Sequence, residues 1–113
     1  MNIGKKLAEA INEQINAEFW SAYFYLAMAN YWEEQGRKGV TNWYKVQFRE
    51  EQAHAEIFID YLHNRNGQVC LKPIGEVKQS WESLAETFAD TLAHEQEVTR
   101  RIHALYALAE EEK

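Results

Sequence analysis

The chain has 113 residues, of which 46% are hydrophobic, which is enough for one compact domain and too little for two. Its 18 acidic and 12 basic residues give a net charge of -6, which repels nucleic acid and anionic membrane surfaces and leaves metal ions and proteins as the expected partners. The single cysteine, Cys70, excludes an internal disulfide and a four-cysteine metal centre, and it favours the reducing cytoplasm as the location.

The amino-terminal segment predicts a long helix over residues 5–35. The start, Met1 to Lys6, leads into an amphipathic stretch and lacks the apolar core of a signal peptide, and no run is long and apolar enough to span a bilayer. Inward positions recur at spacings of three and four residues. They are Leu7, Ile11, Gln14, Glu18, Ala22, Tyr25, Ala29 and Trp32. A carboxylate, Glu18, therefore interrupts an apolar stripe near the middle of this helix.

The second half of the same helix, from Phe19 to Trp32, is apolar on almost every face. The side that carries Trp20, opposite Glu18, must therefore also be covered. A partner subunit is one natural cover. The alternative is that Trp20 and Phe24 pack against the later crossover connection, or against a missing helix of the same chain.

Residues 40–64 predict a second long helix. It follows the short Gly36-Arg37-Lys38-Gly39 turn, so it should pack antiparallel to the first. Its inward stripe consists of Val40, Tyr44, Gln47, Glu51, His54, Phe58 and Tyr61. Glu51 and His54 lie three residues apart on one face, close enough to bind the same ion. An inward histidine is more often a hydrogen-bonded core residue than a metal ligand, so this motif alone does not predict a metal site.

A connection over residues 65–82 separates this helix from a third one, predicted over residues 84–112. The connection is too long for a tight hairpin and can travel the length of the bundle. Ser83 and Glu86 form a Ser-x-x-Glu capping box that places the start of the third helix. Its inward stripe consists of Leu84, Phe88, Thr91, Glu95, Val98, Ile102, Leu105 and Ala109. The sequence therefore predicts an all-α bundle with one crossover.

The three stripes together place Glu18, the Glu51-x-x-His54 pair and Glu95 on converging faces. Burying several carboxylates side by side is strongly destabilising unless a cation neutralises them. The alternative is that these glutamates sit at the edges of the stripes, where they reach solvent or pair with Arg49, Arg100 and Arg101. Three glutamates plus a histidine favour a metal site, and mixed carboxylate and imidazole ligation suits iron or manganese.

Other candidates are sorted by their direction on the helix. Asp60 and His63 repeat the motif nine residues further on, which at about 100° per residue is the opposite side, so we expect them at the surface. His94 and His103 point away from Glu95, and we expect them to be exposed or at an interface. Glu50 could bind an additional ion at the margin of the site or be a solvated glutamate. Tyr25, two turns after Glu18, could reach the metals or hydrogen-bond a ligating carboxylate.

These motifs resemble the bacterial non-haem ferritin family. The resemblance is carried by Asn12 to Ser21, Tyr25-Leu26, Glu50 to His54 and His94-Glu95-Gln96, and it covers nearly the whole chain. It implies a di-iron ferroxidase centre in an iron-storage subunit, whose oxidant is dioxygen or peroxide and whose ferric mineral is stored in a homo-oligomeric shell. It also implies that Glu18, Glu51 and His54 hold one iron, that Glu51 bridges, that Glu95 serves the second iron, and that Glu50 serves a third iron site with Tyr25 close by.

Family members continue into a fourth long helix with further ligands, which these residues do not include. The resemblance thus implies a single ferritin-like domain over residues 1–113, incomplete at its C-terminal end, in which the second and third iron positions lack ligands. One rival function is a helical self-association scaffold with an inactive metal site. Another is a di-iron protein that reduces peroxide or oxygen without storing iron.

Overall fold

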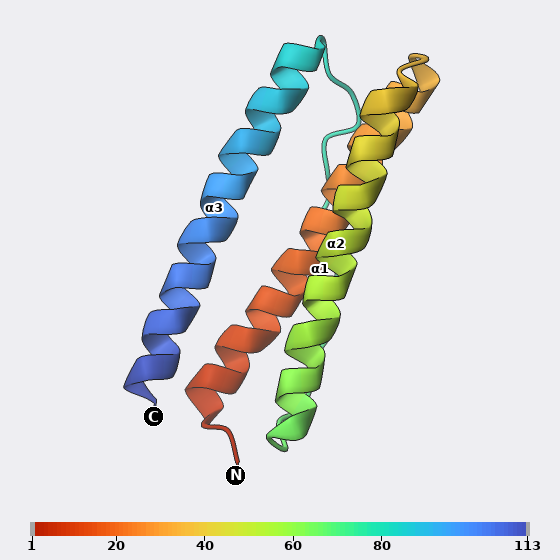
Figure 1. Cartoon of the computed structure of the whole chain (residues 1–113). Helices are drawn as coiled ribbons and strands as arrows, with labels where there is room; N and C mark the ends of the chain where they lie inside the picture. Colours follow the sequence, from red (N-terminus) through yellow and green to blue (C-terminus); the bar gives the residue numbers. More distant parts are fainter. Residues whose placement is uncertain (1, 113) are drawn as a thin grey trace.

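The computed structural model describes residues 2–112 and contains three long helices, α1 (Lys5–Glu34), α2 (Lys38–Asn64) and α3 (Leu84–Glu111) (Figure 1). The predicted all-α fold is confirmed, and each boundary lies within two residues of its expected position. Helix α1 runs antiparallel to α2, and the crossover returns along this pair so that α3 also runs antiparallel to α1 (Figure 1). No helix within residues 2–112 is long and apolar enough to cross a membrane.

Helices α1 and α2 end in the same type of C-terminal cap. At the end of α1, Gly36 has a φ of 77°, and the Arg37 and Gly36 amides donate to the carbonyls of Trp32 and Glu33. At the end of α2, Asn66 takes the corresponding left-handed position with a φ of 59°. This arrangement satisfies carbonyls that a helix end otherwise leaves unpaired. The short connection between α1 and α2 therefore fixes the hairpin that carries the site.

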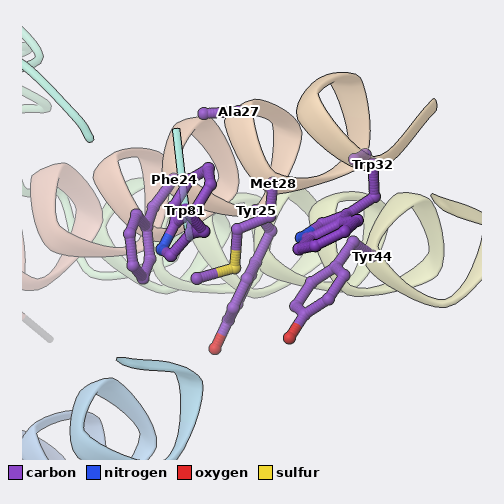
Figure 2. Packing of buried hydrophobic residues seen from close by; sticks show 8 residues of the cluster. Phe24, Tyr25, Ala27, Met28, Trp32, Tyr44 and Trp81 are labelled. Atoms are coloured by element: carbon purple, nitrogen blue, oxygen red, sulfur yellow. The ribbon is translucent and has the colours of Figure 1, made fainter. Parts of the chain in front are cut away.

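The core divides into two hydrophobic clusters along α1. One lies toward the α1–α2 turn and includes Phe24, Tyr25, Met28, Trp32, Tyr44 and Trp81. The other lies toward the opposite end and includes Leu7, Ile11, Ile15 and Leu62. In Figure 2 the hydroxyl groups of Tyr25 and Tyr44 point out of the first cluster on the same side. The polar residues Glu18 and Glu51 lie between the two clusters along the hairpin.

The crossover connection covers the Trp20 side of α1. The Trp20 indole donates to the Glu76 carbonyl at 3.2 Å, and the Phe24 ring lies 6.2 Å from that of Trp81 between centroids. Further down α1, Asn12 donates to the Gln68 carbonyl at 2.9 Å. The alternative that the crossover of the same chain packs on Trp20 and Phe24 is therefore confirmed.

Helix α3 packs against α1 and leaves the side between α2 and α3 open. Within residues 2–112, no Cα atom of α3 lies within 8 Å of one in α2. Large apolar side chains consequently remain exposed along both helices. They are Trp43, Val46 and Ile57 on α2, and Phe88, Leu92 and Tyr106 on α3. The prediction that Phe88 faces inward is wrong, because its side of α3 has no neighbouring helix and the residue is 50% exposed.

Candidate metal site

Glu18, Glu51 and His54 come together at the middle of the hairpin. His54 Nδ1 lies 3.7 Å from Glu18 Oε2 and 3.7 Å from Glu51 Oε2. One potential ligand atom from each of the three residues lies within 4.8 Å of the other two. Glu51 and His54 share a face because they are three residues apart on α2, whereas Glu18 reaches them from the antiparallel helix. The structure thus brings together three of the five residues that the sequence nominated as ligands.

The two carboxylates are deeply buried and incompletely satisfied. Glu18 is 2% exposed and Glu51 is 5% exposed. Glu18 Oε2 and Glu51 Oε2 have no hydrogen-bond partner among the described residues. Native proteins rarely leave buried polar atoms unpaired, and two adjacent carboxylates add repulsion to the desolvation cost. A cation between these oxygens and the histidine nitrogen would remove both penalties.

Burial raises the pKa of Glu51 well above its usual range, and the neighbouring Glu18 raises it further. Two carboxyl groups so close together cannot both ionise easily in a desolvated site. Without a bound cation, the pair therefore retains a proton in the neutral range. A divalent cation would displace this proton as it binds.

The arginine alternative is not supported for the buried pair. Arg100 and Arg101 both donate to Glu97, at 2.7 Å and 3.2 Å for the closest contacts. Within residues 2–112, no arginine forms an ion pair with Glu18 or Glu51, and the basic group beside both carboxylates is His54, at 3.7 Å from each. Both carboxylates also lie inside the bundle rather than at the stripe edges. Their charges are consequently available to a cation.

Glu95 lies apart from the three-residue cluster. Its side chain accepts a hydrogen bond from the Tyr25 hydroxyl, and the residue itself is exposed. Among residues 2–112, Glu95 therefore lies at the exposed edge of its stripe and outside the buried cluster. Burial raises the pKa of Tyr25, and the bond to Glu95 raises it further, so the phenol keeps its proton and acts as a donor. Tyr25 thus ties the α3 carboxylate to α1.

The remaining candidates fall into exposed and buried groups. Glu50, Asp60, His63 and His103 are all exposed, so the surface positions predicted for the last three are confirmed. Glu50 does not join the cluster of Glu18, Glu51 and His54.

His94 is half-buried, which corrects the expectation of an exposed or interfacial residue. Its Nε2 lies 2.6 Å from Ser21 Oγ, and its ring packs 5.4 Å from that of Phe24 between centroids. Burial lowers the pKa of His94. The signal was available in the sequence, since His94 follows Thr91 by three residues and Thr91 follows Thr87 by four. These residues form the face of α3 that packs on α1.

Comparisons with known proteins place this geometry in a family. Residues 8–113 match the family described as the Ferritin-like domain. The chain is similar to the bacterial non-heme ferritins of Staphylococcus haemolyticus (strain JCSC1435) and Bacteroides fragilis (strain 638R), with 39% and 40% identity over 111 residues. These matches cover 98% of this chain and 67% and 70% of the two relatives, so the chain is shorter than both.

Solved structures agree with the sequence matches. The open-pore ferritin of the hyperthermophilic archaeon Archaeoglobus fulgidus superposes with a TM-score of 0.95 at 44% identity, over 97% of this chain and 67% of that one. A structure described as a humanized archaeal ferritin gives a TM-score of 0.96 at 43% identity. The hairpin, the crossover and the third helix therefore have the arrangement found in ferritins. The chain belongs to the ferritin family.

Proposed function

We propose that this chain is an iron-binding subunit of a ferritin-type ferroxidase that oxidises Fe(II) and stores it as ferric mineral in an oligomeric shell. Iron storage is the role of the family to which it belongs. The observation that carries the proposal is a pair of buried oxygens, Glu18 Oε2 and Glu51 Oε2, which have no hydrogen-bond partner in residues 2–112 and lie beside His54 Nδ1. Two carboxylates and an imidazole form a donor set that suits iron.

The residues have different roles in this proposal. Glu18, Glu51 and His54 hold the first iron, and Glu51 also bridges to a second iron served by Glu95. Tyr25 supports the second position because its hydroxyl holds Glu95 near α1. Glu50 serves a third position at the exposed margin. The buried cluster supports the first position most strongly.

The chemistry follows from the charges. Two Fe(II) ions supply two electrons, which reduce dioxygen to hydrogen peroxide or peroxide to water. Anionic carboxylates stabilise the more highly charged Fe(III) product more than Fe(II), so they favour oxidation. The proton held by the Glu18–Glu51 pair leaves when iron binds. Hydrolysis of Fe(III) then gives a hydrated ferric oxide.

The open side of the molecule supports a further helix and an oligomer. Ile57 on α2 and Tyr106 on α3 are exposed apolar residues that line one shared cavity on this side. A bundle built on the di-iron template also needs ligands from a fourth helix. We propose that a helix not among these 113 residues fills this side and completes the second and third iron positions. We also propose that the protein acts in the cytoplasm, as the single cysteine suggests.

One observation favours a second function. Glu95 is exposed and lies outside the buried cluster, so these residues alone hold at most one nearly complete iron position. A helical scaffold that self-associates through its apolar edges would need no more than this. The number of Fe(II) ions bound per chain distinguishes the ferroxidase subunit from the scaffold, since a scaffold with an inactive site binds almost no Fe(II).

The proposal is tested by Fe(II) oxidation in wild type, Glu51→Ala and a matched control, Asp60→Ala. Asp60 is an exposed carboxylate on the same helix, so its loss changes the net charge equally without touching the cluster. We expect Glu51→Ala to slow oxidation at least about tenfold, as loss of a ligand does, and Asp60→Ala to match wild type. Equal rates in all three proteins would overturn the site assignment. Mineral-filled particles under the electron microscope would distinguish storage from oxidant reduction alone.

A further inference from the structure

The Glu18 carboxylate has one hydrogen-bonded oxygen and one free oxygen. Gln14, one turn earlier on α1, donates from Nε2 to Glu18 Oε1 at 2.9 Å. Both side chains are buried, and Gln14 is 5% exposed. Glu18 Oε2 has no hydrogen-bond partner among the described residues and lies 3.7 Å from His54 Nδ1. The two oxygens of one carboxylate therefore have different environments.

This asymmetry fixes the direction of the carboxylate. A carboxylate on a flexible glutamate side chain rotates freely unless something holds one oxygen. The amide of Gln14 holds Oε1, so Oε2 is directed at Glu51 and His54. Because the amide is neutral, it orients Glu18 without cancelling the charge that a cation needs. A lysine or arginine at this position would form an ion pair and compete with the cation.

Gln14 also borders the surface of the protein. It lines a surface cavity of about 530 Å³ between α1 and α3, together with Glu13, Ala17, Ser21 and His94. Glu18 does not line this cavity, although its Oε1 is bound to a residue that does. Without Gln14, Glu18 could turn toward the cavity and its water. The amide therefore keeps the carboxylate turned toward the site.

We propose that Gln14 is a positioning residue for the metal site, which acts by holding Glu18 Oε1 so that Oε2 is aimed at the cation. This inference rests on the proposed function, because it requires a cation to bind at Glu18, Glu51 and His54. Hydrogen-bonding partners of metal ligands typically change metal affinity by about 10- to 100-fold when they are removed. We expect the Gln14 amide to act in this range.

The test uses Co(II), whose visible absorption reports the geometry of its ligands, as the probe of the whole chain. Gln14→Met and Gln14→Leu both remove the amide while keeping a side chain of similar size. The matched control is Gln52→Met, which alters an exposed glutamine next to Glu51. Calorimetry gives the Kd, the cobalt absorption bands give the ligand geometry, and circular dichroism checks that each variant is helical.

We expect both Gln14 variants to fold, to bind Co(II) about tenfold or more weakly, and to shift the cobalt bands, while Gln52→Met matches wild type. A purely structural role would change the melting temperature and leave the bands of the bound cobalt unchanged. Wild-type affinity and bands in a folded Gln14 variant would overturn this inference and leave the proposed function intact. Failure of the wild-type chain to bind Co(II) would overturn both.

Discussion

The α1–α2 hairpin and α3 differ in how many of their residues are buried. The candidate site shows the same difference, because its residues on the hairpin and on α3 are not equally buried. The hairpin contains almost all of the buried core, and it holds Glu18 and Glu51 in a desolvated position. Helix α3 has two buried residues, Thr87 and Thr91. The α3 carboxylate, Glu95, is exposed and tethered by Tyr25. The hairpin therefore holds Glu18 and Glu51 of the proposed metal site through its buried core, whereas Glu95 on α3 is held by its bond to Tyr25.

Polar bonds join the first half of α3 to the hairpin, whereas Leu105, Leu108 and Ala109 in its second half pack against the cluster of Leu7, Ile11, Ile15 and Leu62. The Trp32 indole donates to Thr87 Oγ1 at 2.9 Å, and the Tyr44 and Thr91 hydroxyls lie 2.7 Å apart. Each such bond contributes only about 1 kcal/mol net, and each has a direction that fixes the rotation of α3. These contacts orient α3 more than they stabilise it.

The largest expected effect comes from breaking the hairpin core. Trp32→Ala should lower the free energy of unfolding by about 3–5 kcal/mol, because it removes a buried indole and leaves Thr87 without its donor. The half-buried Leu105→Ala on α3 is the comparison, with an expected loss below about 2 kcal/mol. Urea unfolding followed by circular dichroism measures both. Equal losses would show that α3 is as firmly packed as the hairpin.

A smaller effect should appear in the way the free energy of unfolding of the metal-free protein depends on pH. The raised pKa of Glu51 means that the folded chain holds a proton that the unfolded chain has already released. The free energy of unfolding should therefore fall as the pH rises from the usual carboxyl range through neutrality. Glu51→Gln should remove this slope and stabilise the metal-free chain at pH 8 by about 1 kcal/mol or more.

The same linkage predicts that metal binding releases protons. Calorimetry of Co(II) binding at pH 7 in two buffers of different ionisation enthalpy should show net proton release, and Kd should fall as the pH rises. A wild-type chain whose stability is flat between pH 6 and 8, and whose metal binding releases no protons, would contradict the buried carboxylate pair.

The smallest expected effect concerns the tether between α1 and α3. Tyr25→Phe keeps the buried ring and removes the hydrogen bond to the exposed Glu95, which should lower the free energy of unfolding by about 0.5–1 kcal/mol. The loss should be local, so amide hydrogen exchange should speed up in α3 around Glu95 and change little in α2. Uniform acceleration across all three helices would contradict a local tether. Tyr44→Phe, which breaks the bond to Thr91, is the matched control nearer the start of α3.

The parts that sequence reasoning predicted correctly depend on local spacing. Glu51 and His54 share a helical face through their three-residue separation, and the Ser83–Glu86 cap begins α3 where expected, with the Glu86 amide 3.0 Å from Ser83 Oγ. The position of Glu18 opposite them follows from the short turn, which sets the register of the hairpin. These features depend only on residue spacing within one helix or on the short turn between two neighbouring helices.

The parts that it did not predict depend on how α3 rotates about its own axis. The stripe of α3 that includes Phe88 and Glu95 was expected to face inward, as it would if another helix lay beside it. The structure buries Thr91 of that stripe, but it packs Thr87 and His94 of the adjacent face against α1 and leaves Phe88 and Glu95 exposed. Helical periodicity identifies the apolar faces but does not say which neighbour each face meets.

The central claim is that Glu18, Glu51 and His54 form a preformed iron position. The most direct test is an anomalous difference map, recorded at the iron absorption edge, from crystals of the chain soaked anaerobically with Fe(II). The account predicts a peak bounded by these three side chains that is lost in Glu51→Ala. Iron found only at exposed groups such as Asp60 and His63, with no peak between Glu18 and Glu51, would contradict it.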